Sequence, residues 1–276
     1  DGIREVSQFI LDLIRFTGRR ESVKGGLTER SANLMHLSGV GCPPHWKNPS
    51  VPGLDGTVLD GEVILAEEHI KRLRSQGVPV GGLSKAVGSI MNCLPPESLR
   101  KMEERGFLRY AVFDCLWFRN VDLRSYPLSE RRKYIPHAIR EWNNPYAIVA
   151  ASAVDNKKAF LEQALIDGEE GIILKDLRAP YGKKTAWVKW KQVWTADCVI
   201  MGYEAASETS IKKGDTEATV TKYHANGWIG GIVVGQFKDG QLIQVTNPGH
   251  GVSGMDDALR AELSTNGAAY LGRVIK

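Results

Sequence analysis

Short apolar segments with the length of β-strands recur along the 276-residue chain. Between them lie stretches with the periodicity of helices, such as residues 66–76 and the segment that Asp155 can cap and Gly168 can end. The alternation predicts a mixed α+β fold. The strand-like segments of the first two thirds of the chain are residues 59–65, 109–118, 146–154, 171–174 and 187–191.

The pattern of predicted strands and helices changes after Trp194. From there on, residues 255–263 suit a helix, and Phe237-Lys238-Asp239-Gly240 is typical of a hairpin turn. Short strands, a hairpin and one helix predict a small β-barrel such as an OB-fold, with four of its five strands present. These strands are expected at residues 198–203, 227–236, 241–245 and 269–275. We therefore predict two domains, residues 1–194 and residues 195–276, with the barrel incomplete at its C-terminal end.

Positive charge is concentrated in the first domain. The residues before Thr195 carry 29 Lys and Arg against 23 Asp and Glu, whereas those from Thr195 onward carry 7 against 9. The basic part is the part expected to meet a polyanion, although a merely soluble basic domain fits the charge alone equally well.

The cellular setting is predicted from what the sequence does not contain. No apolar run reaches the roughly 18–20 residues of a membrane span, and the first residues do not resemble a signal peptide. The four cysteines form no CxxC pair, which argues against structural zinc and for a reducing compartment. We expect an intracellular protein without membrane contact.

Four segments carry residue types that suit nucleotide chemistry. Asp60 and Glu62 share one side of a strand, where a carboxylate can bind Mg²⁺, and Glu170 leads another apolar strand. Lys189 and Lys191 share a strand face about 7 Å apart, a spacing that suits phosphate oxygens. In the fourth segment, an aromatic side chain, that of Phe113, could stack on a purine base.

Each segment also has a simpler interpretation when it is taken alone. The acidic residues fit a turn and a helix-to-strand connection, the lysines fit an exposed edge strand, and the phenylalanine fits a core position. The combination favours the functional interpretation, because carboxylates, paired lysines and an aromatic ring together describe a pocket for a nucleotide, its phosphates and a metal ion.

The order of these segments resembles a known family. DGIR at residues 1–4, DGE at 60–62, VFD at 112–114, EGIILK at 170–175 and KWK at 189–191 resemble the motifs of covalent nucleotidyltransferases. The closest resemblance is to small viral and bacterial ATP-dependent DNA ligases, and it covers essentially the whole chain. YPLSERR at residues 126–132 resembles a PLxxRR stretch of DNA ligases and argues against capping enzymes. The resemblance implies a nucleotidyltransferase (adenylation) domain of packed antiparallel sheets with helices, followed by the OB-fold.

The resemblance also implies a role for each motif residue. Asp1, Gly2 and Arg4 match the end of a KxDGxR motif, so the nucleophilic lysine is expected two residues before Asp1, outside the chain. A further basic motif is expected after Lys276, on the last strand of the barrel. Arg4 would hold AMP and the nick, and Arg19, chosen over Arg20 in a basic turn at a strand end, would bind the 5′-phosphate of the nick. The remaining implied contacts are ribose and metal for Glu62, the base for Phe113, metal for Glu170, and phosphate for Lys189 and Lys191.

The implied reaction is the ATP-dependent sealing of nicks in duplex DNA, with Mg²⁺ as the metal. The lysine takes AMP from ATP, AMP passes to the 5′-phosphate of the nick, and the 3′-hydroxyl displaces it. We expect a monomer acting on nicked double-stranded DNA, in a bacterium, a phage-infected cell or the nucleus of a cell infected by a eukaryotic virus. The alternatives are an RNA ligase or mRNA guanylyltransferase of the same superfamily, or a nick-binding protein without catalytic activity.

Overall fold

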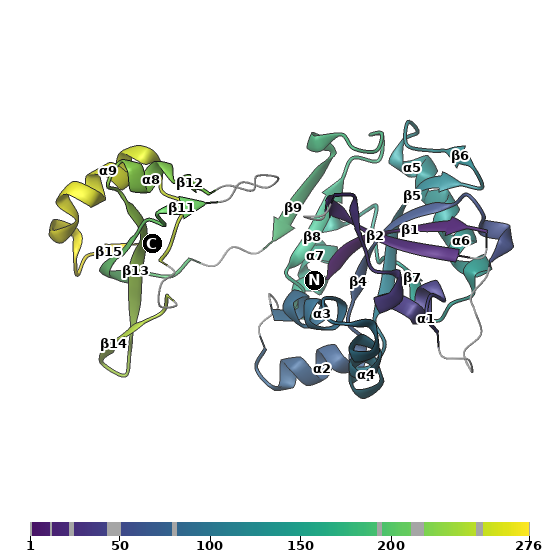
Figure 1. Cartoon of the computed structure of the whole chain (residues 1–276), viewed down its shortest axis with the longest axis horizontal. Helices are drawn as coiled ribbons and strands as arrows, with labels where there is room; N and C mark the ends of the chain where they lie inside the picture. The colour runs from purple at the N-terminus through teal and green to yellow at the C-terminus, as the bar shows by residue number, and fades with distance from the viewer. Residues whose placement is uncertain are drawn as a thin grey trace. The chain divides into compact units, whose positions relative to one another are not determined.

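The chain forms two compact units, Asp1–Gln192 and Val193–Lys276 (Figure 1). The computed structural model describes residues 2–11, 13–21, 25–42, 51–78, 82–191, 195–210, 218–246 and 251–275. Both units combine helices with mostly antiparallel strands, which confirms the predicted α+β class. No helix within these ranges is long and apolar enough to cross a membrane.

A seven-stranded sheet forms the centre of the first unit. Its strands run in the order β3-β2-β1-β4-β5-β6 with antiparallel neighbours, and β7 pairs with β5 in parallel. Residues 58–64 and 109–118 become strands where the sequence predicts them, because their apolar residues can be buried in a sheet. The strands are β1 (Ile3–Ile10), β2 (Leu13–Glu21), β3 (Leu27–Glu29), β4 (Val58–Ile64), β5 (Arg109–Phe118), β6 (Val121–Asp122) and β7 (Ala147–Val149).

Helices cover the apolar face of this sheet. The core joins Leu59 and Tyr110 of the sheet to Val87 of α3 and Trp142 of α6, and all four side chains are buried. Phe9 and Trp142 meet edge to face with ring centroids 5.0 Å apart. The helices of this unit are α1 (Met35–Ser38), α2 (Glu67–Ser75), α3 (Leu83–Met91), α4 (Pro95–Arg105), α5 (Leu128–Arg131), α6 (Ile135–Trp142) and α7 (Lys157–Ile166).

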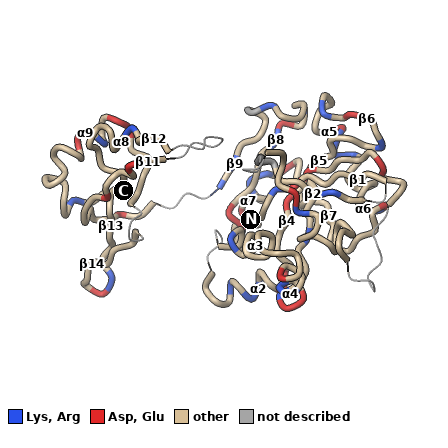
Figure 2. Tube along the Cα trace, in the orientation of Figure 1, with Lys and Arg blue, Asp and Glu red and all other residues tan. Residues whose placement is uncertain are grey.

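A separate two-stranded antiparallel sheet, β8 (Gly171–Lys175) and β9 (Trp187–Lys191), follows α7. The loop between the two strands is tied to α5, because the amide of Leu128 donates to Ala179 O and the amide of Ser129 to Leu177 O, at 3.1 and 2.9 Å. We call this sheet and its loop, residues 171–191, the hairpin. Figure 2 shows Lys and Arg segments along it.

The second unit contains a four-stranded sheet in the order β14-β13-β10-β15 and a two-stranded sheet of β11 and β12. Its small core includes Ile200, Ile232, Val234 and Leu263. The predicted hairpin turn is confirmed at Asp239, which has a φ of 53°. That the unit is an OB-fold stays a prediction. Its elements are β10 (Cys198–Ala205), β11 (Thr209–Ser210), β12 (Thr219–Val220), α8 (Lys222–Ala225), β13 (Ile229–Lys238), β14 (Gln241–Gln244), α9 (Asp257–Asn266) and β15 (Val274–Ile275).

Three local predictions are wrong. The strand expected at residues 146–154 is limited to β7, and the one expected at 269–275 begins with 3-10 helix and is limited to β15. Asp155 does not cap α7. The N-cap is Asn156, in the left-handed region at φ 48°, which asparagine tolerates better than most residues.

Candidate active site

Arg4 on β1 is fixed by a buried carboxylate on the neighbouring strand β4. Its Nε donates to Asp60 Oδ1 at 2.8 Å, and its Nη2 donates to the second oxygen of the same carboxylate. The hydroxyl of Tyr181, from the hairpin loop, donates to Asp60 Oδ2 at 2.8 Å. Burial, reinforced by Asp60, raises the pKa of Tyr181 to about 12, so the hydroxyl keeps its proton. The two-pronged pair fixes the orientation of the guanidinium.

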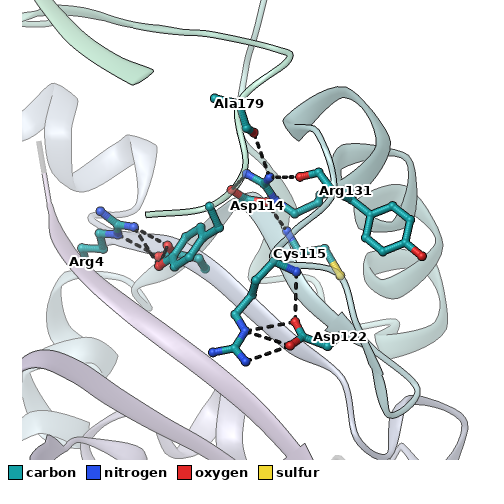
Figure 3. A network of polar contacts seen from close by, with 10 residues as sticks. Arg4, Asp114, Cys115, Asp122, Arg131 and Ala179 are labelled. Carbon is teal, nitrogen blue, oxygen red and sulfur yellow. Dashed lines mark hydrogen bonds and ion pairs between the residues drawn. The ribbon is translucent and has the colours of Figure 1, made fainter. Parts of the chain in front are cut away.

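A second buried ion pair lies beside the first. Asp114 on β5 stands opposite Asp60 in the strand register and accepts from Nε and Nη2 of Arg131 at 2.8 and 2.7 Å. Nη1 of Arg131 donates to Tyr126 O at 2.6 Å and to Ala179 O at 3.1 Å (Figure 3). The buried charges are therefore compensated, and the interaction connects β5, α5 and the hairpin loop.

Two aromatic rings and two cations meet where the hairpin faces β5. Phe113 and Trp187 are edge to face with centroids 5.5 Å apart. Nζ of Lys175 lies 3.9 Å from the Phe113 centroid and 4.0 Å from that of Trp187. The guanidinium carbon of Arg4 lies 5.2 and 4.8 Å from the same two centroids. Phe113 is half-buried and does not belong to the core cluster, so the structure does not favour the simple core interpretation.

Burial lowers the pKa of Lys175 to about 8. The carboxylates of Asp114 and Asp60 act in the opposite direction, whereas Arg4 and Arg132 lower the pKa further. Close to neutral pH this amine therefore gives up its proton more readily than an ordinary lysine.

The start of β1 lies against Glu62. The amide of Gly2 donates to Glu62 Oε1 at 2.6 Å, and a β-carbon at position 2 would stand 2.1 Å from Val63 O. Glycine is thus required for the chain to approach β4 this closely. Arg4 is paired with Glu62 in the strand register, so two predicted site residues are neighbours.

Glu170 and the two lysines of β9 occupy the open end of the hairpin. Nζ of Lys191 lies 2.8 Å from Glu170 Oε1, and this hydrogen bond is the main cause that lowers the pKa of Glu170. Lys189 is exposed, and the strand register places it on the same face as Lys191.

The predicted metal ligands, Glu62 and Glu170, have different partners in the structure. Among the residues that the structure describes, no group of three His, Cys, Asp or Glu side chains could hold a metal ion by itself. Magnesium is commonly held by one or two carboxylates together with substrate phosphates, and the two glutamates fit that pattern.

The resemblance assigns two further residues, Asp1 and Arg19, to the site. Asp1 lies outside the described residues, and so does the side chain of Arg19. The backbone at Arg19 belongs to β2, so the predicted turn is wrong there. The pairing of β2 with β3 is irregular between Thr17 and Glu21.

Residue patterns alone missed several members of the site. Lys175 ends the EGIILK motif and Trp187 begins the strand predicted at residues 187–191, but neither receives a role from the sequence. The partner of Asp114 is not evident from the sequence either. Tyr181 carries no sequence signal, because its contact with Asp60 joins positions 121 residues apart.

Comparisons with known proteins agree with these features. A family model described as "ATP dependent DNA ligase domain" matches residues 44–191. A probable DNA ligase of Dictyoglomus turgidum is 29% identical over 153 residues, which cover 51% of this chain and 24% of the relative. The DNA ligase of Vaccinia virus (strain Western Reserve) is 27% identical over 157 residues, which cover 52% of this chain and 25% of the relative.

Solved structures share the fold at low identity. A structure titled "Pmar-Lig_Pre." matches 100% of this chain and 55% of its own, with a TM-score of 0.59 at 15% identity. A structure from a study of Lig E DNA ligases matches 100% of this chain and 86% of its own, with a TM-score of 0.54 at 16% identity. In the Dictyoglomus turgidum and Vaccinia virus relatives, the match to this chain spans about a quarter of the relative's own length.

Proposed function

The chain belongs to the ATP-dependent DNA ligase family, and we propose that it is part of an enzyme that uses ATP to seal nicks in duplex DNA. The observation that carries this proposal is a half-buried aromatic ring, Phe113, facing a hairpin whose exposed end presents Lys189 and Lys191. An aromatic surface next to a pair of cations fits a nucleotide, whose base stacks and whose phosphates carry the negative charge.

The strand register supports this arrangement of the nucleotide. Trp187, Lys189 and Lys191 share one face of β9, and Trp187 contacts Phe113. The base would therefore lie at the Phe113 end of the hairpin, and the phosphates would lie at the Lys191 end. Trp187 and Lys191 are four residues apart, about 13 Å along an extended strand.

The nucleophilic lysine is proposed to enter beside Glu62. Gly2 is held against this glutamate, so the residues that precede Asp1 in the family motif would continue from the N-terminal end of β1, beside Glu62. A lysine has an ordinary pKa of about 10.4 and must lose its proton before it attacks the α-phosphate. The cations Lys189 and Lys191 near the phosphate end favour the neutral amine of a neighbouring lysine.

Each of the three steps transfers a phosphate group from one atom to another, and charge neutralisation and positioning provide the rate enhancement. The lysine nitrogen bonds to the α-phosphorus as pyrophosphate leaves, and the 5′-phosphate of the nick then takes AMP from the lysine. The 3′-hydroxyl finally bonds to the phosphorus of this 5′-phosphate, and AMP leaves from the same phosphorus. A bound Mg²⁺, held by Glu62 and Glu170, would supply further positive charge to the phosphates.

We assign recognition of the nick to arginines of the first unit. Arg4 is already oriented by Asp60, and Arg19 is proposed to bind the 5′-phosphate. The excess of Lys and Arg before Thr195 supports contact with the DNA backbone. We propose that the protein acts on DNA as a monomer.

The test is a sealing assay with the full-length gene product on a nicked DNA duplex that bears a 5′-phosphate. We expect sealing with ATP and Mg²⁺, little with GTP, and none at a 5′-hydroxyl nick. Lys189→Ala should slow sealing about 100-fold, as loss of a positioned charge donor does. Lys158→Ala removes another exposed lysine, from α7, and should leave the rate unchanged.

Two results would contradict the proposal. One is a preference for nicked RNA over nicked DNA, or for GTP over ATP, which would favour an RNA ligase or an mRNA guanylyltransferase of the same superfamily. The other is tight binding to nicked DNA without any sealing, which would favour a binding protein.

A further inference from the structure

A cavity of about 340 Å³ lies at the C-terminal end of β5. Its walls come from this strand end, the turn that leads to β6, the short 3-10 helix Arg132–Tyr134 and α6. The volume falls in the range of ligand-binding pockets, about 300–1,000 Å³. The cavity shares no lining residue with the candidate active site. It is lined by Phe118, Arg119, Tyr134, His137, Arg140 and Glu141.

Two aromatic rings form the apolar wall of this cavity. The ring centroids of Phe118 and Tyr134 are 4.9 Å apart, and the rings are inclined by 40°. Both side chains are half-buried, so each keeps some exposed surface. Val121 is paired with Phe118 in the strand register and is 55% exposed, so the apolar surface continues from the cavity onto β6. An aromatic side chain of a ligand could be buried against this wall.

Arg119 holds the rim of the cavity in place. Its guanidinium carbon lies 5.1 Å from the centroid of Phe118, and its Nε donates to Gly53 O at 2.8 Å. Its Nη2 donates to Glu141 Oε2 at 2.6 Å, so the charge of this glutamate is balanced. These contacts fix the turn against α6, and the cavity is therefore formed before a ligand arrives.

Arg140 and His137 provide the donors that remain for a ligand. Nη2 of Arg140 lies 2.7 Å from Nδ1 of His137. A guanidinium can only donate, so Nδ1 accepts, and we assign the proton of the neutral imidazole to Nε2. Within the described part of the chain, neither the other N–H groups of Arg140 nor Nε2 of His137 has a partner. Because Glu141 is paired with Arg119, the charge of Arg140 is not balanced by any lining carboxylate.

We propose that this cavity is a docking site for an acidic peptide segment of a partner protein. An aromatic side chain of the peptide packs against Phe118 and Tyr134, and a neighbouring carboxylate accepts from Arg140 and from Nε2 of His137. Charge complementarity selects this occupant. The single unbalanced cation of the lining fits one carboxylate beside an apolar group, whereas a polyanion such as DNA needs a row of cations. The proposal goes beyond the proposed function and does not depend on it.

The experiment selects binders from a library of short randomised peptides on the immobilised full-length protein. A parallel selection uses the Arg140→Glu variant. We expect the wild type to enrich peptides in which an aromatic residue adjoins an acidic one, and we expect the charge-reversed variant not to enrich them.

The affinity of an enriched peptide is then measured by fluorescence anisotropy. Arg140→Ala should bind it about 10- to 100-fold more weakly than the wild type does, as expected for loss of hydrogen bonds between charged groups. A version of the peptide with amides in place of its carboxylates should bind the wild type and Arg140→Ala equally, because the group that Arg140 contacts is then missing.

Arg72→Ala is the matched control. Arg72 is an exposed arginine of another helix, α2, and does not line the cavity, so this variant should bind the peptide as the wild type does. Arg140 is exposed as well, so the melting temperatures of these variants should stay close to that of the wild type. The affinity of Arg140→Ala for nicked DNA, measured alongside, should also be unchanged.

Three results would overturn the proposal. The first is a wild type that enriches no peptides of the aromatic and acidic type, and the second is equal binding of the enriched peptide by the wild type and Arg140→Ala. The third is weaker binding of nicked DNA by Arg140→Ala but not by Arg72→Ala, which would assign the cavity to a DNA contact. None of these results bears on the sealing reaction, which the assay described above tests separately.

Discussion

Asp114 and Arg131 are almost fully enclosed, with side chains 0% and 1% exposed. Removing one partner would leave the other charge buried without compensation, which usually costs about 3–5 kcal/mol. We predict a loss of this size in the free energy of unfolding for Asp114→Leu and for Arg131→Met, measured by urea denaturation. The double variant should lose much less than the sum, since no unpaired charge remains. Additive losses would show that the pair contributes no coupling energy.

At this scale the sequence is informative about residue types but not about partners. Lys189 and Lys191 were predicted to share a face from strand periodicity alone, and the register agrees. The partners of Arg4 and Tyr181 could not be predicted, because both depend on Asp60, which is 56 and 121 residues away in the chain. Such contacts depend on how distant strands align, which local propensity does not encode.

The hairpin depends on a glycine where β8 begins. Gly171 has a φ of 149°, and a β-carbon there would stand 2.4 Å from Trp190 O and 2.6 Å from the α-carbon of Lys191. We predict that Gly171→Ala opens the pairing of β8 with β9. Amide exchange of residues 171–175 and 187–191 should accelerate about tenfold or more.

Gly182→Ala is the control for this change. Gly182 also has a positive φ, 84°, but no atom lies within 4 Å of the added carbon, so the exchange of both strands should stay as in the wild type. Equal acceleration in the two variants would assign the effect to backbone strain alone and contradict the role of close approach at Gly171.

Elements with a strong apolar pattern could be predicted with accurate limits. β5 and β9 begin and end at the predicted residues, since each is a continuous strand-length segment. The strand expected at residues 146–154 was too long, because β7 has a partner only where it lies against β5, at residues 147–149. Pairing, and not propensity, sets such limits.

At the scale of the whole molecule, the two units have separate cores and opposite charge balance. The site residues described above belong to the first unit, and the hairpin is the last element of that unit. This arrangement predicts that nucleotide chemistry is a property of the first unit and that the second unit contributes to the contact with DNA. The second half of this prediction rests on the expected OB-fold.

We propose above that the start of β1, the neighbouring Glu62 and the hairpin form a covalent nucleotide-transfer site. The most direct measurement is the intact mass of the full-length protein after incubation with ATP and Mg²⁺, with peptide mapping of the modified residue. We expect a gain of one AMP on the lysine two residues before Asp1, and we expect this AMP to be lost when nicked DNA with a 5′-phosphate is added. A protein that contains this lysine and gains no mass, or gains AMP on another residue, would contradict the proposal.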